Sequence, residues 1–232
     1  MSEIYPLLIS TIGIAIIHTI TGPDHYLPFI ALSRSKNWSI TKTIGWTMIC
    51  GIGHVLSSVL LGLGGASIGW GIDKLSFIEN QRGNIAAWGL LIFGCIYFVW
   101  GMINAYRNKM HKHFESDEEG NMFVYEHKHS AFTLPLKKHK VTPWIIFIIF
   151  LLGPCEPMIP LLFAPSVNNN LAGLITLIII YTSFTLLAML LMVMLGYWGV
   201  TFTNTNKLER YMHAIAGLTL MICGAGMLCW NW

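Results

Sequence analysis

The chain has 232 residues, of which 54% are hydrophobic and only 11% are charged, and its formal net charge at pH 7 is +3. A soluble globular domain carries roughly 25% charged residues, so this composition excludes an ordinary water-soluble domain. The five cysteines all lie in apolar segments, which argues against a disulfide framework. The beginning, MSEIYPLLIS, lacks the basic region and the cleavage site of a signal peptide.

Six apolar segments are long enough to cross a bilayer, since a spanning helix needs about 20 mostly apolar residues. They cover residues 4–32, 43–71, 84–106, 143–166, 171–200 and 211–232. The loops after the first, third and fifth segments hold twelve Lys and Arg residues, and the opposite side holds two, Lys74 and Arg82. Because basic loops stay in the cytoplasm, we expect an inner or plasma membrane protein with both termini outside and the loop 107–142 in the cytoplasm.

The first segment contains the motif TGPDHYLPFIAL. Pro23 lacks a backbone donor and clashes with the preceding turn, so the helix should break or kink at Gly22-Pro23. Broken backbone at membrane depth is tolerated only where it lines protein or a wet cavity. His18, Asp24 and His25 flank this break, and ionisable groups inside a membrane are costly enough to indicate function. We interpret these three as ion ligands or relay residues; a packing kink is the alternative interpretation of the break.

The second and third segments offer fewer chemical groups. His54 lies in the sequence GIGHVLSS of the second segment, where small residues allow another helix to approach closely. A ligand role and an interhelical hydrogen bond are equally good interpretations of this histidine. Cys95 in the third segment and Cys223 in the sixth are interpreted as packing residues, because a free thiol behaves as a small hydrophobe.

The loop 107–142 separates two units, residues 1–106 and residues 143–232, and is rich in histidine. Its five histidines stand among acidic residues and lysines, and they are His111, His113, His127, His129 and His139. This composition fits a solvated linker, and it fits equally a cytoplasmic segment that binds metal, as His-rich tracts do.

The fourth segment contains LGPCEPMIPLLFAPS, which repeats the first motif. In both motifs Gly-Pro precedes two ligand-type residues, a proline and an apolar tail that ends in serine. The third and sixth segments also align, through GLLIFGC and GLTLMIC. Because each unit has an odd number of segments, the second must be inverted relative to the first, as in many transporters. The predicted fold is an all-α integral membrane protein of six helices, built as two inverted three-helix repeats with proline-broken first helices.

The ionisable groups of interest inside the apolar segments are Asp24, His25 and Glu156 of the two motifs, together with His18 and His54. No Lys or Arg of the same segments is available to neutralise the carboxylates. Imidazole and thiolate suit a divalent first-row metal better than sodium or calcium. The sequence therefore predicts a metal site formed by His18, Asp24, His25, His54, Cys155 and Glu156.

These residues resemble the NicO/UreH group of nickel–cobalt transporters, within the LysE-type transporter superfamily. The resemblance covers nearly the whole chain as architecture: six spans, a His-rich loop and an Asp-His pair that closes the first span. The family signature has four residues between the first His and Asp-His, whereas HTITGPDH has five between His18 and Asp24. GIGHVLSS is similar to the family's Gly-His and maps a ligand role onto His54. The resemblance implies transport of nickel or cobalt.

The second motif is similar to the Pro-Cys segments of CcdA/DsbD-like membrane thiol-disulfide carriers, which implies a redox role for Cys155 as an alternative function. That family has a cysteine in both halves, and the first half here has Asp24-His25 at the matching position. A TauE-like exporter of sulfur compounds and an accessory protein for metalloenzyme maturation are two further alternatives.

The leading hypothesis is a transporter, not an enzyme, whose substrate is a divalent transition-metal ion, nickel or cobalt first. We expect no organic cofactor and no nucleic-acid partner. The expected partners are the metal ion and the lipid bilayer. The sequence is compatible with a monomer and with a homo-oligomer.

Overall fold

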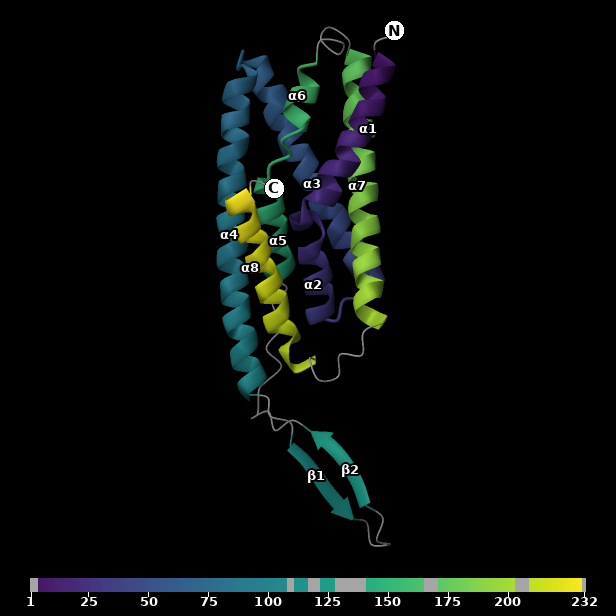
Figure 1. Ribbon diagram of the computed structural model, residues 1–232, viewed down its shortest axis with the longest axis vertical. Helices are drawn as coiled ribbons and strands as arrows, with labels where there is room; N and C mark the ends of the chain where they lie inside the picture. The colour runs from purple at the N-terminus through teal and green to yellow at the C-terminus, as the bar shows by residue number, and fades with distance from the viewer. Residues whose placement is uncertain are drawn as a thin grey trace.

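The computed structural model describes residues 4–107, 111–116, 122–127, 141–164, 171–202 and 209–230. Within these ranges the chain is helical apart from one two-stranded hairpin. Figure 1 shows the helices lying side by side along one common axis. The helices are α1 (Ile4–Thr21), α2 (Leu27–Ser35), α3 (Ile40–Ser67), α4 (Ile72–Arg107), α5 (Val141–Leu152), α6 (Met158–Leu162), α7 (Leu171–Phe202) and α8 (Met212–Trp230). Two short 3-10 helices, η1 (Pro23–His25) and η2 (Glu209–Tyr211), and strands β1 (His111–Ser116) and β2 (Met122–His127) complete the described elements.

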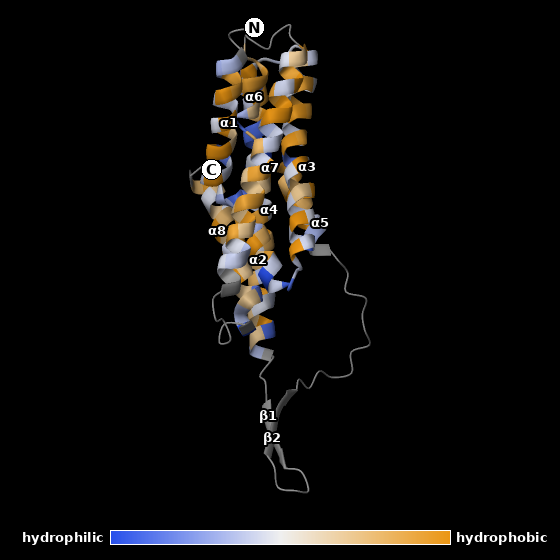
Figure 2. Cartoon of the chain, turned by 90° about the vertical axis from the view of Figure 1, so that its right-hand side faces the viewer, coloured by the Kyte–Doolittle hydropathy of each residue, from blue (hydrophilic) through white to orange (hydrophobic). Residues whose placement is uncertain are grey.

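Four helices are long and apolar enough to cross a membrane: α3, α4, α7 and α8. The α1–α2 pair adds a fifth crossing when it is counted as one span, although it bends by 81° at its break. Helix α5 is apolar but has only 12 residues. Large aliphatic side chains such as Ile9, Leu60 and Leu195 point outward and are more than 60% exposed, and Figure 2 shows hydrophobic colour along the outer faces of the helices. The prediction of an all-α, multi-pass membrane protein is confirmed at this level.

Both Gly-Pro sequences interrupt helices, as predicted. Helix α1 ends at Thr21, and Gly22 adopts an extended conformation, with φ −89° and ψ 92°, before the 3-10 turn that begins at Pro23. Helix α5 ends at Leu152, and α6 begins at Met158. The missing backbone donor of proline accounts for both interruptions.

The start of α4 and the loop 107–142 both differ from the sequence prediction. Helix α4 begins at Ile72, twelve residues before the predicted start of the third span, so Glu79 and Arg82 lie on a helix and not in a loop. The predicted start of the third span was too late because charged residues lower the local mean hydropathy, although the helix continues through them. The loop prediction contained no strands, yet β1 and β2 pair antiparallel, with His111 opposite His127. His129 and His139 lie outside the described residues.

The helices pack in a pattern that relates the two halves of the chain. The α1–α2 pair packs against α7 and α8, whereas the α5–α6 pair packs against α3 and α4. Helix α3 also contacts α7, and α4 packs along α8 through its most extensive contact. Glycine makes that last contact close, since a Cβ atom added to Gly94 would lie 2.6 Å from the Met221 backbone nitrogen.

Candidate metal centre

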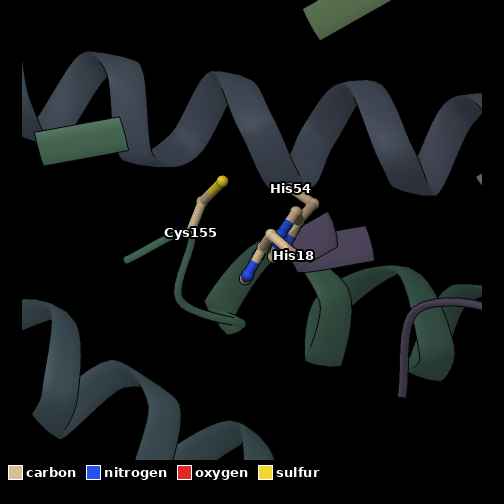
Figure 3. Close-up of side chains that lie close together, drawn as sticks. All are labelled: His18, His54 and Cys155. Carbon is tan, nitrogen blue, oxygen red and sulfur yellow. The ribbon is translucent and has the colours of Figure 1, made fainter. Parts of the chain in front are cut away.

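Three side chains of types that can bind a metal ion, from three segments, meet inside the bundle. His18 comes from α1, His54 from α3 and Cys155 from the connection between α5 and α6. One ligand atom of each lies within 4.8 Å of the others, and Figure 3 shows the three side chains side by side. A tetrahedral metal with bonds of about 2.0–2.3 Å sets its ligand atoms roughly 3.5 Å apart, so binding would draw these atoms about 1 Å closer together.

His25 and Asp24 extend this cluster from the first helix break. The ring of His25 lies between the other two imidazoles, with its centroid 4.8 Å from that of His18 and 5.1 Å from that of His54. Asp24 Oδ1 lies 3.3 Å from His25 Nδ1. The structure therefore brings together five of the six residues in the predicted metal site.

Backbone carbonyls fix which ring nitrogen of two histidines carries hydrogen. His25 Nδ1 lies 3.0 Å from the Gly22 carbonyl oxygen, and His54 Nδ1 lies 3.3 Å from the Phe150 carbonyl oxygen. Because a carbonyl oxygen only accepts, Nδ1 is the donor in both rings, and in a neutral ring Nε2 then keeps its lone pair. Metal-binding histidines use this same arrangement, in which the second nitrogen is held by a hydrogen bond.

The ligand-type atoms of the centre are buried without hydrogen-bond partners. Among the described residues, the atoms in this state include His18 Nε2, Asp24 Oδ1, His25 Nε2 and His54 Nε2. Such groups normally find a partner, because leaving one unsatisfied costs about 1–3 kcal/mol. A cavity of about 20 Å³, lined in part by Asp24, His25 and His54, lies beside them. It has room for roughly one water molecule or ion.

Glycine at both breaks makes room for the imidazoles. A Cβ atom added to Gly22 would lie 2.5 Å from His25 Nδ1. A Cβ atom added to Gly153 would lie 3.2 Å from His54 Nδ1. The glycines of the two related motifs therefore perform the same task, since each allows one histidine of the centre to lie against the backbone of a helix break.

Glu156, the sixth predicted ligand, is exposed and does not belong to the cluster. Its neighbour Cys155 is fully buried, and Cys155 Sγ lies 3.1 Å from the Tyr181 hydroxyl. Cys155 and Glu156 lie at a turn that is closed by the hydrogen bond from the Met158 backbone nitrogen to the Cys155 carbonyl oxygen, and this turn buries Cys155 while it leaves Glu156 exposed.

A buried ion pair near the second break was missed by the sequence analysis. Glu79 is 1% exposed, and its Oε2 accepts a hydrogen bond of 2.9 Å from Arg82 Nη1. Arg82 lies outside the predicted segment 84–106, and the pair enters the bundle because α4 begins earlier than that segment. The spacing of three residues between Glu79 and Arg82 on one helix face is the signal that could have identified the pair.

The chain was also compared with known proteins. Comparisons with protein-family models, with curated proteins and with solved structures found no match.

Proposed function

We propose that the chain is a membrane transporter for a divalent transition-metal ion, with nickel or cobalt as the first candidates. The ion would bind between His18, Asp24, His25, His54 and Cys155. One observation carries the proposal: the Nε2 atoms of His18, His25 and His54 lie buried without hydrogen-bond partners beside the Asp24 carboxylate in an apolar bundle. A purely structural cluster would satisfy these atoms internally, whereas a site for a cation leaves them available.

The donor set favours a transition metal over a hard cation. Three imidazoles and one thiol are borderline to soft ligands, which suit nickel, cobalt and zinc better than calcium or sodium. Protons compete with a metal for the same lone pairs. A drop in pH would therefore release the ion, and this competition supplies a way to couple metal movement to a proton gradient.

The architecture we propose is six spans in two inverted repeats of three. The α1–α2 pair would correspond to the α5–α6 pair, α3 to α7, and α4 to α8. The helix contacts support this assignment, because exchanging the two halves turns the contacts of α1 with α7 and of α2 with α7 and α8 into those of α5 with α3 and of α6 with α3 and α4. Sites between such repeats lie near the bilayer midplane, where broken helices meet. The bound ion would then lie at the contact between the two breaks and could be reached alternately from either side.

The alternative functions have less support. A thiol carrier of the CcdA/DsbD type needs a second thiol near Cys155, whereas the hydrogen-bond neighbour of Cys155 Sγ is the Tyr181 hydroxyl, 3.1 Å away. A TauE-like anion exporter needs a basic group free to bind its substrate, and Arg82 is paired with Glu79. An accessory protein for metalloenzyme maturation would use the same metal centre, so transport by the purified protein distinguishes it from a transporter.

Uptake into liposomes tests the proposal. Purified wild-type protein should admit Ni²⁺ or Co²⁺, and Asp24→Asn and His25→Ala should each slow uptake by about tenfold or more. His213→Ala is a matched control, because His213 lies on α8 and bonds to Tyr97 outside the metal centre. Flux that is unchanged in both Asp24→Asn and His25→Ala would reject the proposal. Metal binding without flux in the wild type would favour the accessory protein.

A further inference from the structure

A second group of buried polar atoms lies one helical turn away from the metal centre. Ser58 follows His54 by four residues on α3, so the two side chains share a face and are separated by about 6 Å along the helix. Ser58 Oγ and Glu79 Oε1 are both buried without a hydrogen-bond partner within the described part of the chain. Both residues lie between the metal centre and the connection from α3 to α4.

Only one of the two carboxylate oxygens of Glu79 accepts a hydrogen bond. Oε2 accepts a hydrogen bond from Arg82, while Oε1 has none, although the side chain as a whole is only 2% exposed. Burying an ionised carboxylate is costly unless all its lone pairs find partners. The hydroxyl of Ser58 is the donor next to this carboxylate, but it does not reach Oε1 with hydrogen-bond geometry, so this oxygen is left as an open acceptor.

Arg82 is held rigidly and in turn holds Glu79. Its Nη2 donates to Ser57 Oγ at 2.7 Å and to the Leu151 carbonyl oxygen at 2.8 Å. Ser57 Oγ itself donates to the His54 carbonyl oxygen at 2.8 Å. A chain of hydrogen bonds thus joins Glu79 to the turn that carries His54 and to the last turn of α5. Metal-binding carboxylates are commonly oriented by hydrogen bonds of this kind.

The same surface of α4 lies against the second helix break. A Cβ atom added to Gly83, four residues after Glu79, would lie 2.8 Å from Cγ of Pro154, the residue before Cys155. The Glu79 turn of α4 and the segment that presents Cys155 to the metal centre are therefore direct neighbours.

We propose that Glu79 is a second cation station, which receives the metal ion on its way between the histidine site and the α3–α4 side of the bundle. This inference rests on the proposed transport function. Ser58 shares a face of α3 with His54, and Cys155 of the histidine site follows Pro154, which lies against the Glu79 turn. The charge of Arg82 weakens the attraction of Glu79 for a divalent cation, and this suits a transient station, because conduction requires several sites from which an ion can leave.

Glu79→Gln provides the first test, since it keeps the shape of the side chain and removes its charge. Ni²⁺ flux into liposomes should fall by about tenfold or more, while the affinity of the histidine site stays unchanged. Affinity is measured by calorimetric titration with Ni²⁺ in a background that has asparagine at the loop histidines, His111, His113, His127, His129 and His139. Asp73→Asn is the matched control, because Asp73 is an exposed carboxylate on the same helix and its loss should leave flux unchanged.

A double variant separates a cation station from a purely structural ion pair. Glu79→Gln combined with Arg82→Met removes both charges, so no unpaired guanidinium remains to destabilise the fold. Flux should stay as low as in Glu79→Gln alone. Recovery to the wild-type rate, or unchanged flux in Glu79→Gln, would overturn the station while leaving the proposed function intact. Absence of uptake by the wild-type protein would instead overturn the proposed function, and the station with it.

Discussion

Two glycines decide how closely the imidazoles of the metal centre approach the backbone. Gly22 leaves room for His25, and Gly153 leaves room for His54. Each histidine then donates from Nδ1 to a carbonyl oxygen at or near a helix break, and Nε2 is left for the ion. In the proposed transporter, the glycines would therefore support metal binding without contacting the ion.

Gly22→Ala tests this role at the scale of one methyl group. The new Cβ atom would lie 2.5 Å from His25 Nδ1, so the ring must move and lose its hydrogen bond to the Gly22 carbonyl. Metal affinity should fall by about tenfold, as it does when a histidine ligand loses its supporting partner. Gly13→Ala on α1 is the control, because open space surrounds Gly13. Equal affinities of the two variants in a metal titration would contradict the role of Gly22.

The residue types of the centre were predictable, but one position was not. His18, Asp24, His25 and His54 attract notice because ionisable groups are costly in apolar segments, and the structure gathers them with Cys155. Glu156 satisfied the same criterion and is exposed. Which of two adjacent residues points inward depends on how the α5–α6 segment turns, and hydropathy carries no information on that direction.

Among the helices, the close packing of α4 against α8 depends on small residues. Without water there is little hydrophobic drive between membrane helices, so their association relies on close contact of the two backbones. Gly94 on α4 lies against the backbone of Met221 and Gly217 on α8.

Gly94→Ala should destabilise the protein by about 1–3 kcal/mol, because the added methyl group meets backbone atoms that cannot rotate away. Thermal unfolding in detergent should show a lower midpoint for this variant. Gly45→Ala on α3 is the matched control: nothing lies within 4 Å of the new methyl group, so its midpoint should not fall. A midpoint for Gly94→Ala as high as that of the control would show that the two helices separate at little cost.

The breaks in α1–α2 and α5–α6 could be predicted because proline acts locally, through its own missing donor. The start of α4 could not be predicted in the same way. Glu79 and Arg82 look like loop residues by composition, and only the tertiary contacts of Arg82 with Ser57 and Leu151 explain why they lie inside the bundle. Helix length is therefore decided here by neighbours that are distant in the sequence.

At the scale of the whole molecule, the distribution of basic residues and the continuity of helix α4 together predict how the chain is oriented in the membrane. The α2–α3 connection and the loop after α4 belong to the basic side, which should be cytoplasmic. The α3–α4 connection, Ile68–Gly71, lies at the opposite end of α4 from that loop. One continuous helix joins the two, so they should lie on opposite sides of the membrane.

Labelling of single cysteines with a membrane-impermeant maleimide checks this orientation, in a background with alanine at the five native cysteines. Gly71→Cys should react in intact cells, because open space surrounds Gly71 and its connection should face outward. Ser116→Cys, in the loop after α4, should react only after the membrane is permeabilised. The reverse pattern would place the histidine-rich loop outside. Reaction of both cysteines from the same side would mean that α4 does not cross the bilayer, and Glu79 could then not line a path through it.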